Sequence, residues 1–162
     1  GQGISVMAGN VATGEAFEEL QDWGADIIRV GVGGGSICST RIQTAHGVPT
    51  LYSVLECSSL ANHSKVVADG GIRNAGDVVK SLAAGADFVM LGRPNLFALA
   101  ADGAAGLESL YAALRYDLSV AMAQIGVETI GQIGYHNLSQ DTQMMTAHTD
   151  AAASAKAKGK KP

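Results

Sequence analysis

The sequence predicts an α/β fold, a (β/α)8 barrel of the TIM type, of which this chain supplies the C-terminal half with about four strand–helix units. Short apolar runs alternate with amphipathic stretches, a pattern that favours a parallel sheet. The segments also repeat in pairs, because Gly24-Ala25-Asp26 after one amphipathic stretch returns as Gly85-Ala86-Asp87 after another. Paired repeats fit a barrel better than a doubly wound sheet, in which the direction of winding reverses.

The predicted elements follow in order along the chain. Apolar runs predict strands at 4–8, 27–30, 65–68 and 88–91, and amphipathic patterning predicts helices at 14–23, 50–62, 76–84 and about 104–125. Gly24 and Gly85 stand where helices end, a position that glycine favours. A glycine-rich loop covers 31–40. Residues 1–140 are therefore expected to form one half-barrel domain, and the low-complexity basic segment 141–162 a disordered tail.

The composition allows a packed core and excludes some partners. Apolar residues make up 47% of the chain and the formal net charge is −4, so nucleic acid is not an expected partner. The two cysteines form no disulfide framework, and no secretory signal or apolar run of about 18 residues appears. Neither a membrane nor an oxidising compartment is expected, and we predict a cytoplasmic protein.

The chain is expected to be a fragment or the product of a split gene, because Gly1 runs almost directly into a predicted strand. A full barrel needs eight units and about 250 residues. Half a barrel leaves two open sheet edges, which tend to pair with other strands. We therefore expect association with another half-barrel, either a copy of this chain in a homo-oligomer or a complementary N-terminal half.

Functional residues of such a barrel lie at the carboxyl ends of its strands. The third loop, which contains Asp69, Gly70 and Gly71, and the fourth, which begins Gly92-Arg93, predict a phosphate site, because glycine lets backbone N–H groups approach an anion. A following helix N-terminus and Arg93 would add positive charge, and Asp69 could accept hydrogen bonds from ribose hydroxyls. The alternative is that the glycines form only a turn and Asp69 a helix cap.

A cysteine in the glycine-rich loop is the candidate nucleophile. Backbone amides around Cys38 could favour the thiolate, which is the reactive form, and Thr40 could share its pocket. A thiolate there could add to an electrophilic ring carbon. The residues alone leave open that Cys38 is a small buried apolar side chain. Cys57 lies in a predicted helix, and we expect it in the core.

Five segments carry a resemblance to a known family. The stretches 7–15, 24–33, 35–41, 68–72 and 85–92, which include Gly35-Ser36-Ile37-Cys38, resemble IMP dehydrogenase and GMP reductase. The resemblance implies a TIM-barrel oxidoreductase that acts on a purine nucleotide, IMP or GMP, with NAD or NADP as the hydride partner. It implies that Cys38 attacks purine C2 to form a covalent intermediate.

The same resemblance implies roles for further residues. Thr40 would lie beside Cys38, Asn10 near the reacting base and the nicotinamide, and Asp69 at the ribose. Ser36, Gly71 and Gly92 would hold the nucleotide phosphate, with Gly70 and Arg93 in the same loops. The backbone carbonyls of Gly33, Gly35 and Cys38 would be candidate ligands for a monovalent cation such as potassium.

After Gly92 the sequence departs from that family, and no match to its mobile flap appears. The segment 91–123 instead resembles the end of FMN-dependent 2-hydroxy acid oxidases, which bind the FMN phosphate with similar Asp-Gly-Gly and Gly-Arg motifs. Three hypotheses remain: a purine-nucleotide oxidoreductase domain that needs the missing half and flap for turnover, an FMN-binding half-barrel, and a non-catalytic phosphate-binding half-barrel that assembles with a partner.

Overall fold

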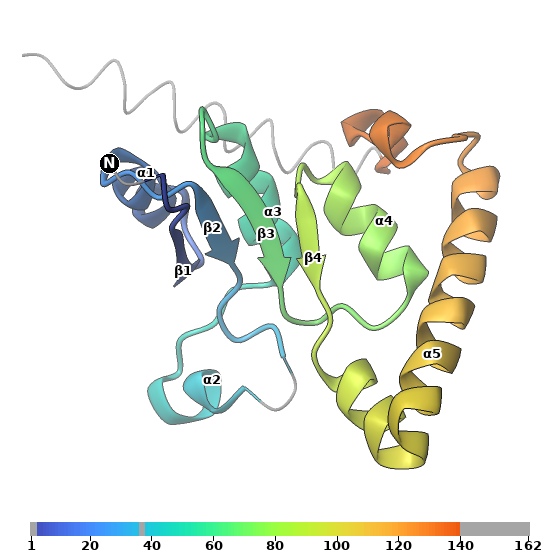
Figure 1. Cartoon of the computed structure of the whole chain (residues 1–162). Helices are drawn as coiled ribbons and strands as arrows, with labels where there is room; N and C mark the ends of the chain where they lie inside the picture. The colour runs from blue at the N-terminus through green and yellow to red at the C-terminus, as the bar shows by residue number, and fades with distance from the viewer. Residues whose placement is uncertain (1–2, 36–37, 140–162) are drawn as a thin grey trace, which may run out of the picture.

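Four parallel strands lie side by side in the order in which they occur along the chain (Figure 1). The computed structural model describes residues 3–35 and 38–139, so the tail predicted at 141–162 lies outside the described residues. The strands are β1 (Met7–Val11), β2 (Ile27–Val30), β3 (Lys65–Asp69) and β4 (Phe88–Met90). An unreversed parallel order is that of a barrel segment, and it confirms the predicted α/β fold.

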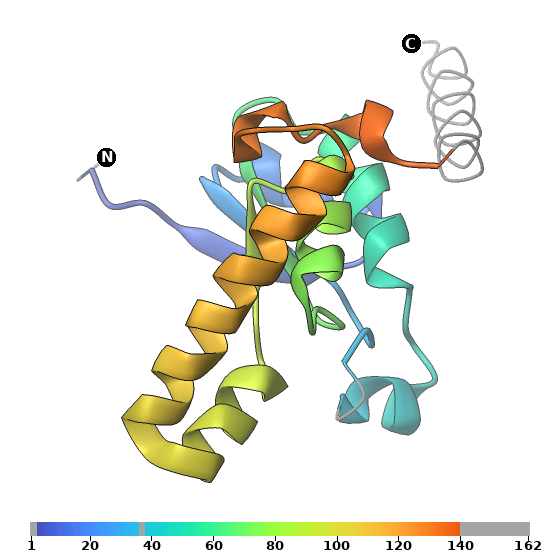
Figure 2. The same cartoon turned by 90° about the vertical axis from the view of Figure 1, so that its right-hand side faces the viewer.

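Helices follow the strands, and those after β1, β3 and the glycine-rich loop cover one face of the sheet. The helices are α1 (Gly14–Asp22), α2 (Ser39–Thr44), α3 (Thr50–Ser59), α4 (Ala75–Ala83) and α5 (Arg93–Gln124), followed by the short 3-10 turns η1 (Ile130–Gln132) and η2 (Tyr135–Asn137). Figure 1 shows α3 behind β3 and α4 beside β4, and Figure 2 shows that α5 consists of a short first part and a long second part joined by a sharp bend. The helix α5 also contacts α4. No helix of residues 3–35 and 38–139 combines the length and apolar character needed to cross a bilayer.

The core lies between the sheet and α1, α3 and α4. Alternate strand residues such as Ile28, Val30 and Val66 point into it, because successive side chains of a strand face opposite ways. Phe17 and Val54 meet them from the helices, and both are fully buried. The cysteine of α3 lies in the same cluster, which confirms the prediction that it is a core residue.

The opposite face of the sheet carries apolar side chains that the described residues leave open. Met7 at one edge strand is 52% exposed, and Phe88 at the other is 57% exposed. In a closed barrel this face would be the packed interior. The described chain therefore presents half of a barrel interior to its surroundings.

The repeated Gly-Ala-Asp motif has a structural role that its sequence did not reveal. Gly24 and Gly85 follow α1 and α4 with φ of +89° and +98°, a conformation that glycine adopts without strain. The aspartate two residues later then reaches back to the preceding strand. Asp26 accepts a hydrogen bond from the Val6 N–H at 2.7 Å, and Asp87 accepts one from the Val66 N–H at 2.8 Å.

Three elements differ from the sequence prediction. The first strand begins at Met7, not at residue 4, because its parallel partner begins at Ile27 and pairs with Met7. Ile4 is 75% exposed. The short helix α2 inside the glycine-rich loop was missed. Helix α5 begins at Arg93 and contains a break at Asp102 and Gly103, so only its second part was predicted.

Candidate functional site

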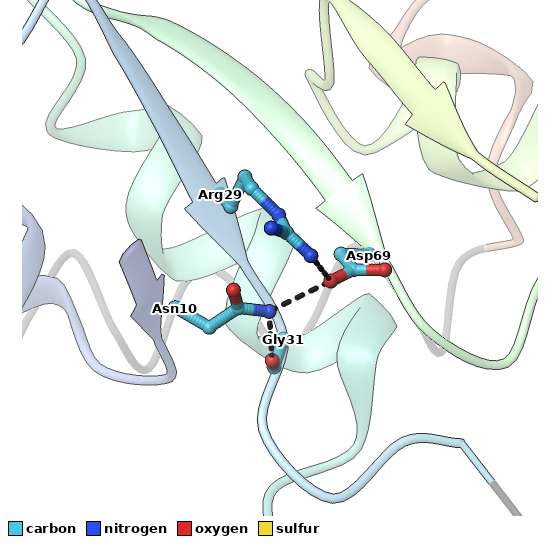
Figure 3. A network of polar contacts seen from close by, with 4 residues as sticks. All are labelled: Asn10, Arg29, Gly31 and Asp69. Carbon is cyan, nitrogen blue, oxygen red and sulfur yellow. Dashed lines mark hydrogen bonds and ion pairs between the residues drawn. The ribbon is translucent and has the colours of Figure 1, made fainter. Parts of the chain in front are cut away.

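Side chains from three neighbouring strands meet at the carboxyl ends of the sheet (Figure 3). The Asn10 Nδ2 atom of β1 donates to Asp69 Oδ2 of β3 at 2.8 Å and to the Gly31 carbonyl at 2.8 Å. The Arg29 Nη2 atom of β2 donates to the same Asp69 Oδ2 at 2.6 Å. Asn10 and Asp69, named from the sequence, are therefore brought together, and Arg29 was missed. Its signal was a charge inside the apolar run 27–30.

This cluster contains polar atoms that have no hydrogen-bond partner among the described residues. Both donors go to one carboxylate oxygen, and among the described residues Asp69 Oδ1 receives no hydrogen bond. Arg29 Nε is buried and has no partner within the described residues. A buried donor without an acceptor costs free energy. The open carboxylate oxygen and the open guanidinium nitrogen therefore suit a polar group that comes from outside these residues.

Close approach of β2 and β3 depends on a glycine. Gly31 has φ of +141°, and a Cβ atom at this position would overlap the carbonyl oxygen of Asp69. Only glycine satisfies both the conformation and the space. The residue that follows β2 therefore allows the Asp69 cluster to form.

A cavity of about 570 Å³ lies beside the loops that follow β2 and β3. Its lining includes Gly33, Gly34, Arg41, Gly70, Gly71 and Lys80. The two loops touch directly, because a Cβ atom on Gly70 would lie 3.3 Å from the Gly35 nitrogen. The sequence predicted a phosphate site formed by the loops after the third and fourth strands, whereas this cavity is lined by the loops after the second and third strands.

The remaining predicted phosphate residues lie apart from this lining. Gly92 is the N-cap of α5 and has open space around it. Arg93 is the first residue of α5 and is half-buried. Neither lines the cavity. Ser36 lies outside the described residues.

The helix N-terminus after the third loop is already capped. Asn74 Oδ1 accepts a hydrogen bond from the Asp77 N–H at 2.9 Å, and Asp77 Oδ2 accepts one from the Arg73 N–H at 3.0 Å. The Asp77 carboxylate also offsets the positive end of the α4 dipole. An anion in this region would therefore rely on the N–H groups of the glycine loop more than on α4.

The two thiols have opposite environments. Cys38 is half-buried at the N-cap of α2. A hydrogen bond from the Thr40 side chain, with smaller contributions from backbone N–H groups, lowers the pKa of Cys38 below its ordinary 9.0. Burial in the core, with Glu56 as a neighbour, raises the pKa of Cys57 to about 12. Thr40 thus lies beside Cys38, and Cys38 is the thiol with reactive character.

The carbonyls predicted to hold a monovalent cation already have partners. Gly33 O accepts from Arg41 Nη1 at 3.3 Å, and Gly35 O accepts from the Cys38 N–H at 3.1 Å. Cys38 is the N-cap of α2, the position whose carbonyl accepts the first bond of the helix. Two unit charges 4 Å apart near a protein surface repel by about 4 kcal/mol. The described geometry therefore does not fit a cation beside the Arg41 guanidinium.

Comparison with known proteins gives a consistent result. A sequence profile described as the IMP dehydrogenase / GMP reductase domain matches residues 1–159. Human GMP reductase 1 is 56% identical over 90 residues, which cover 54% of this chain and 26% of that protein. The inosine-5'-monophosphate dehydrogenase of Aquifex aeolicus is 46% identical over 125 residues, or 76% of this chain and 25% of that protein.

The solved structures that this chain resembles include GMP reductases, in agreement with the sequence comparison. A GMP reductase of Trypanosoma brucei superposes with a TM-score of 0.69 and 36% identity, covering 80% of this chain and 33% of that one. A complex of the Trypanosoma brucei enzyme with guanosine 5'-monophosphate gives a TM-score of 0.54 at 48% identity over 56% of this chain and 19% of that one.

The chain spans about a quarter of the length of the curated relatives that it matches. The profile continues through the segment after Gly92, where the sequence had also resembled FMN-dependent oxidases. The family whose profile matches is therefore the same family whose motifs were identified at the strand ends from the sequence. The chain belongs to the IMP dehydrogenase / GMP reductase domain family.

Proposed function

We propose that this chain is the nucleotide-binding half of a purine-nucleotide oxidoreductase, with Cys38 as the nucleophile. The observation that carries the proposal is the lowered pKa of Cys38 on a loop that touches the glycine loop after β3. The substrate is a purine nucleotide, IMP or GMP, and the Trypanosoma brucei relative that binds GMP supports testing GMP first.

In this proposal each group has a defined task. The free Oδ1 of Asp69 accepts a hydrogen bond from a ribose hydroxyl, and Arg29 and Asn10 hold the carboxylate in place. The Gly71 loop donates backbone N–H groups to the phosphate, and Ser36 is assigned to the same subsite. Gly92 and Arg93 do not line the cavity beside the Gly71 loop and are not part of this proposal.

The chemical step is the addition of the Cys38 thiolate to purine C2, in which a carbon–sulfur bond forms while the C2–N3 π bond breaks and N3 takes up a proton. From IMP the C2 hydride would then pass to an oxidised nicotinamide, and from GMP ammonia would leave before a reduced nicotinamide supplied its hydride. Thr40 lowers the pKa of Cys38 and so favours the thiolate by donating a hydrogen bond to the sulfur. NAD or NADP would take up or supply the hydride. Asn10 lies on β1, next to β2, and the loop that carries Cys38 follows β2. Within the Asp69 cluster, Asn10 is the residue that we assign to the base and the nicotinamide. We place the activity in the cytoplasm on the sequence grounds given above.

We further propose that a second half-barrel completes the site. Met7 and Phe88 are exposed on the two edge strands, and Leu96 and Phe97 are 58% and 68% exposed on the first part of α5. Exposed apolar groups along both edges suit a partner that closes the barrel. The partner is a second copy of this chain or a complementary N-terminal half, and light scattering with and without that half distinguishes the two.

The direct test of the nucleotide assignment is calorimetric titration of the chain with GMP, IMP and FMN, with Cys38→Ala in parallel. We expect saturable binding of a purine nucleotide to both proteins, and nucleotide-protected alkylation of the thiol only in the wild type. Binding of FMN alone would reassign the domain to a flavoprotein. Binding of none of the three, with the complementary half present, would leave a non-catalytic half-barrel.

A further inference from the structure

The loop that carries Cys38 is closed by its own contacts. At its base the Val48 N–H donates to the Val32 carbonyl at 3.0 Å. Gly33 and Gly47 lie so close that a Cβ atom on Gly33 would be 2.8 Å from the Gly47 Cα atom. These two contacts tie the loop into a ring that begins at the end of β2 and ends just before α3.

The Arg41 side chain contacts both glycines at the base of this loop, because Cβ atoms placed on Gly33 and Gly47 would each lie 3.4 Å from Arg41 Cβ. Arg41 projects from α2 and donates through Nη1 to the Gly33 carbonyl at 3.3 Å. Gly33 is two residues from Gly35, whose carbonyl accepts the Cys38 N–H. The guanidinium therefore holds one end of the turn that presents the thiol, and it does so at a carbonyl that the family resemblance had named as a candidate cation ligand.

We propose that Arg41 replaces the monovalent cation in this chain, ordering the Cys38 loop by donating its positive charge to the Gly33 carbonyl. A guanidinium carries a permanent charge and donates hydrogen bonds in a fixed plane, so it performs on carbonyls the electrostatic task of a bound cation. Arg41 is thus a positioning residue that acts on the thiol through the loop backbone. The consequence is a loop whose order does not depend on potassium.

The test is hydrogen–deuterium exchange of the amides of 38–48 in the full chain, in potassium chloride and in choline chloride at equal ionic strength. Three proteins are compared: wild type, Arg41→Ala, and Lys80→Ala. Lys80 lines the same cavity as Arg41, but among the described contacts it donates no hydrogen bond to the loop. The variant Lys80→Ala therefore removes one positive charge, as Arg41→Ala does, without removing a hydrogen bond to the loop. The buried amides around Val54 in α3 report whether each variant remains folded.

We expect the wild type to exchange at the same rate, within about twofold, in both salts. In choline chloride, the loop amides of Arg41→Ala should exchange about three to ten times faster than those of the wild type, which is the factor expected for the loss of one hydrogen bond. In potassium chloride, part of the protection should return, because the vacated Gly33 carbonyl can then accept a cation. Potassium-specific protection of the wild type would overturn the proposal. So would an Arg41→Ala variant that matches Lys80→Ala, or one that exchanges faster but ignores potassium. No nucleotide is present, so the outcome is independent of the proposed reaction.

Discussion

The two cysteines should differ sharply in their reaction with iodoacetamide. Because only the thiolate is nucleophilic, the labelling rate of each thiol follows its thiolate fraction. A pKa of about 12 for Cys57, against less than 9.0 for Cys38, leaves Cys57 with less than roughly a thousandth of the thiolate of Cys38 at neutral pH. Burial of Cys57 in the core widens the difference further.

Labelling is followed by mass spectrometry of the peptides that contain each cysteine, over a series of pH values. The Cys38 rate should rise with pH and reach its half-maximum below pH 9.0, because its lowered pKa populates the thiolate at lower pH. Cys57→Ala should leave the Cys38 profile unchanged. Thr40→Val, which removes the hydroxyl that donates to the sulfur, should move the midpoint upward. Equal labelling of the two cysteines, or a Cys38 midpoint at or above 9.0, would refute the assignment of the reactive thiol.

Three further predictions test the surrounding structure. Asp69→Asn should weaken purine-nucleotide binding about tenfold or more in calorimetry, since it removes the carboxylate that pairs with Arg29 and that we propose as the acceptor for a ribose hydroxyl; unchanged affinity would remove Asp69 from the site. Gly31→Ala should lower the free energy of unfolding by about 2–4 kcal/mol in a urea titration, because it adds backbone strain to a steric overlap; a neutral result would contradict the described approach of β2 and β3. The pKa of Lys65 is raised by its hydrogen bond to Asp87, so the stability from this pair is present below pH 10.5 and is lost as pH rises through the raised pKa. Asp87→Asn, which keeps an oxygen for the strand N–H, should flatten that alkaline loss of thermal stability, and an unchanged alkaline profile would count against it.

The polar cluster at the strand ends combines structural and functional roles. Asp69 joins three strands through its contacts with Asn10 and Arg29, and it keeps one oxygen available. An ion pair that is about one-third exposed contributes little to stability on its own. Its value here is orientation, because two donors on one oxygen fix the direction in which the other oxygen points.

Much of the fold could be predicted because it depends on local patterns. Apolar runs of four to five residues between amphipathic stretches identified β2, β3 and β4 almost to the residue. The predicted start of β1 was wrong because the strand begins where its partner β2 begins, at the pair Met7–Ile27, and strand pairing cannot be read from the apolar residues Ile4 and Val6. The first part of α5 was missed because the segment that begins Gly92-Arg93 was interpreted as a strand-end loop, and the break at Asp102 and Gly103 separates it from the amphipathic stretch that was predicted.

The sequence by itself determined the parallel strand–helix order, the position of Asp69 at the end of a strand and of Cys38 in the loop after β2, and the core position of Cys57, whereas Asn10, expected in a loop, lies within β1. Each of these follows from a residue and its near neighbours. Only the tertiary structure decided that Arg29 completes the Asp69 cluster and that the second and third loops share a cavity. It also decided that Arg41 occupies the Gly33 carbonyl. The physical reason is that these contacts join separate strands and loops, and their geometry depends on strand register and on where each loop folds back, which local sequence does not encode.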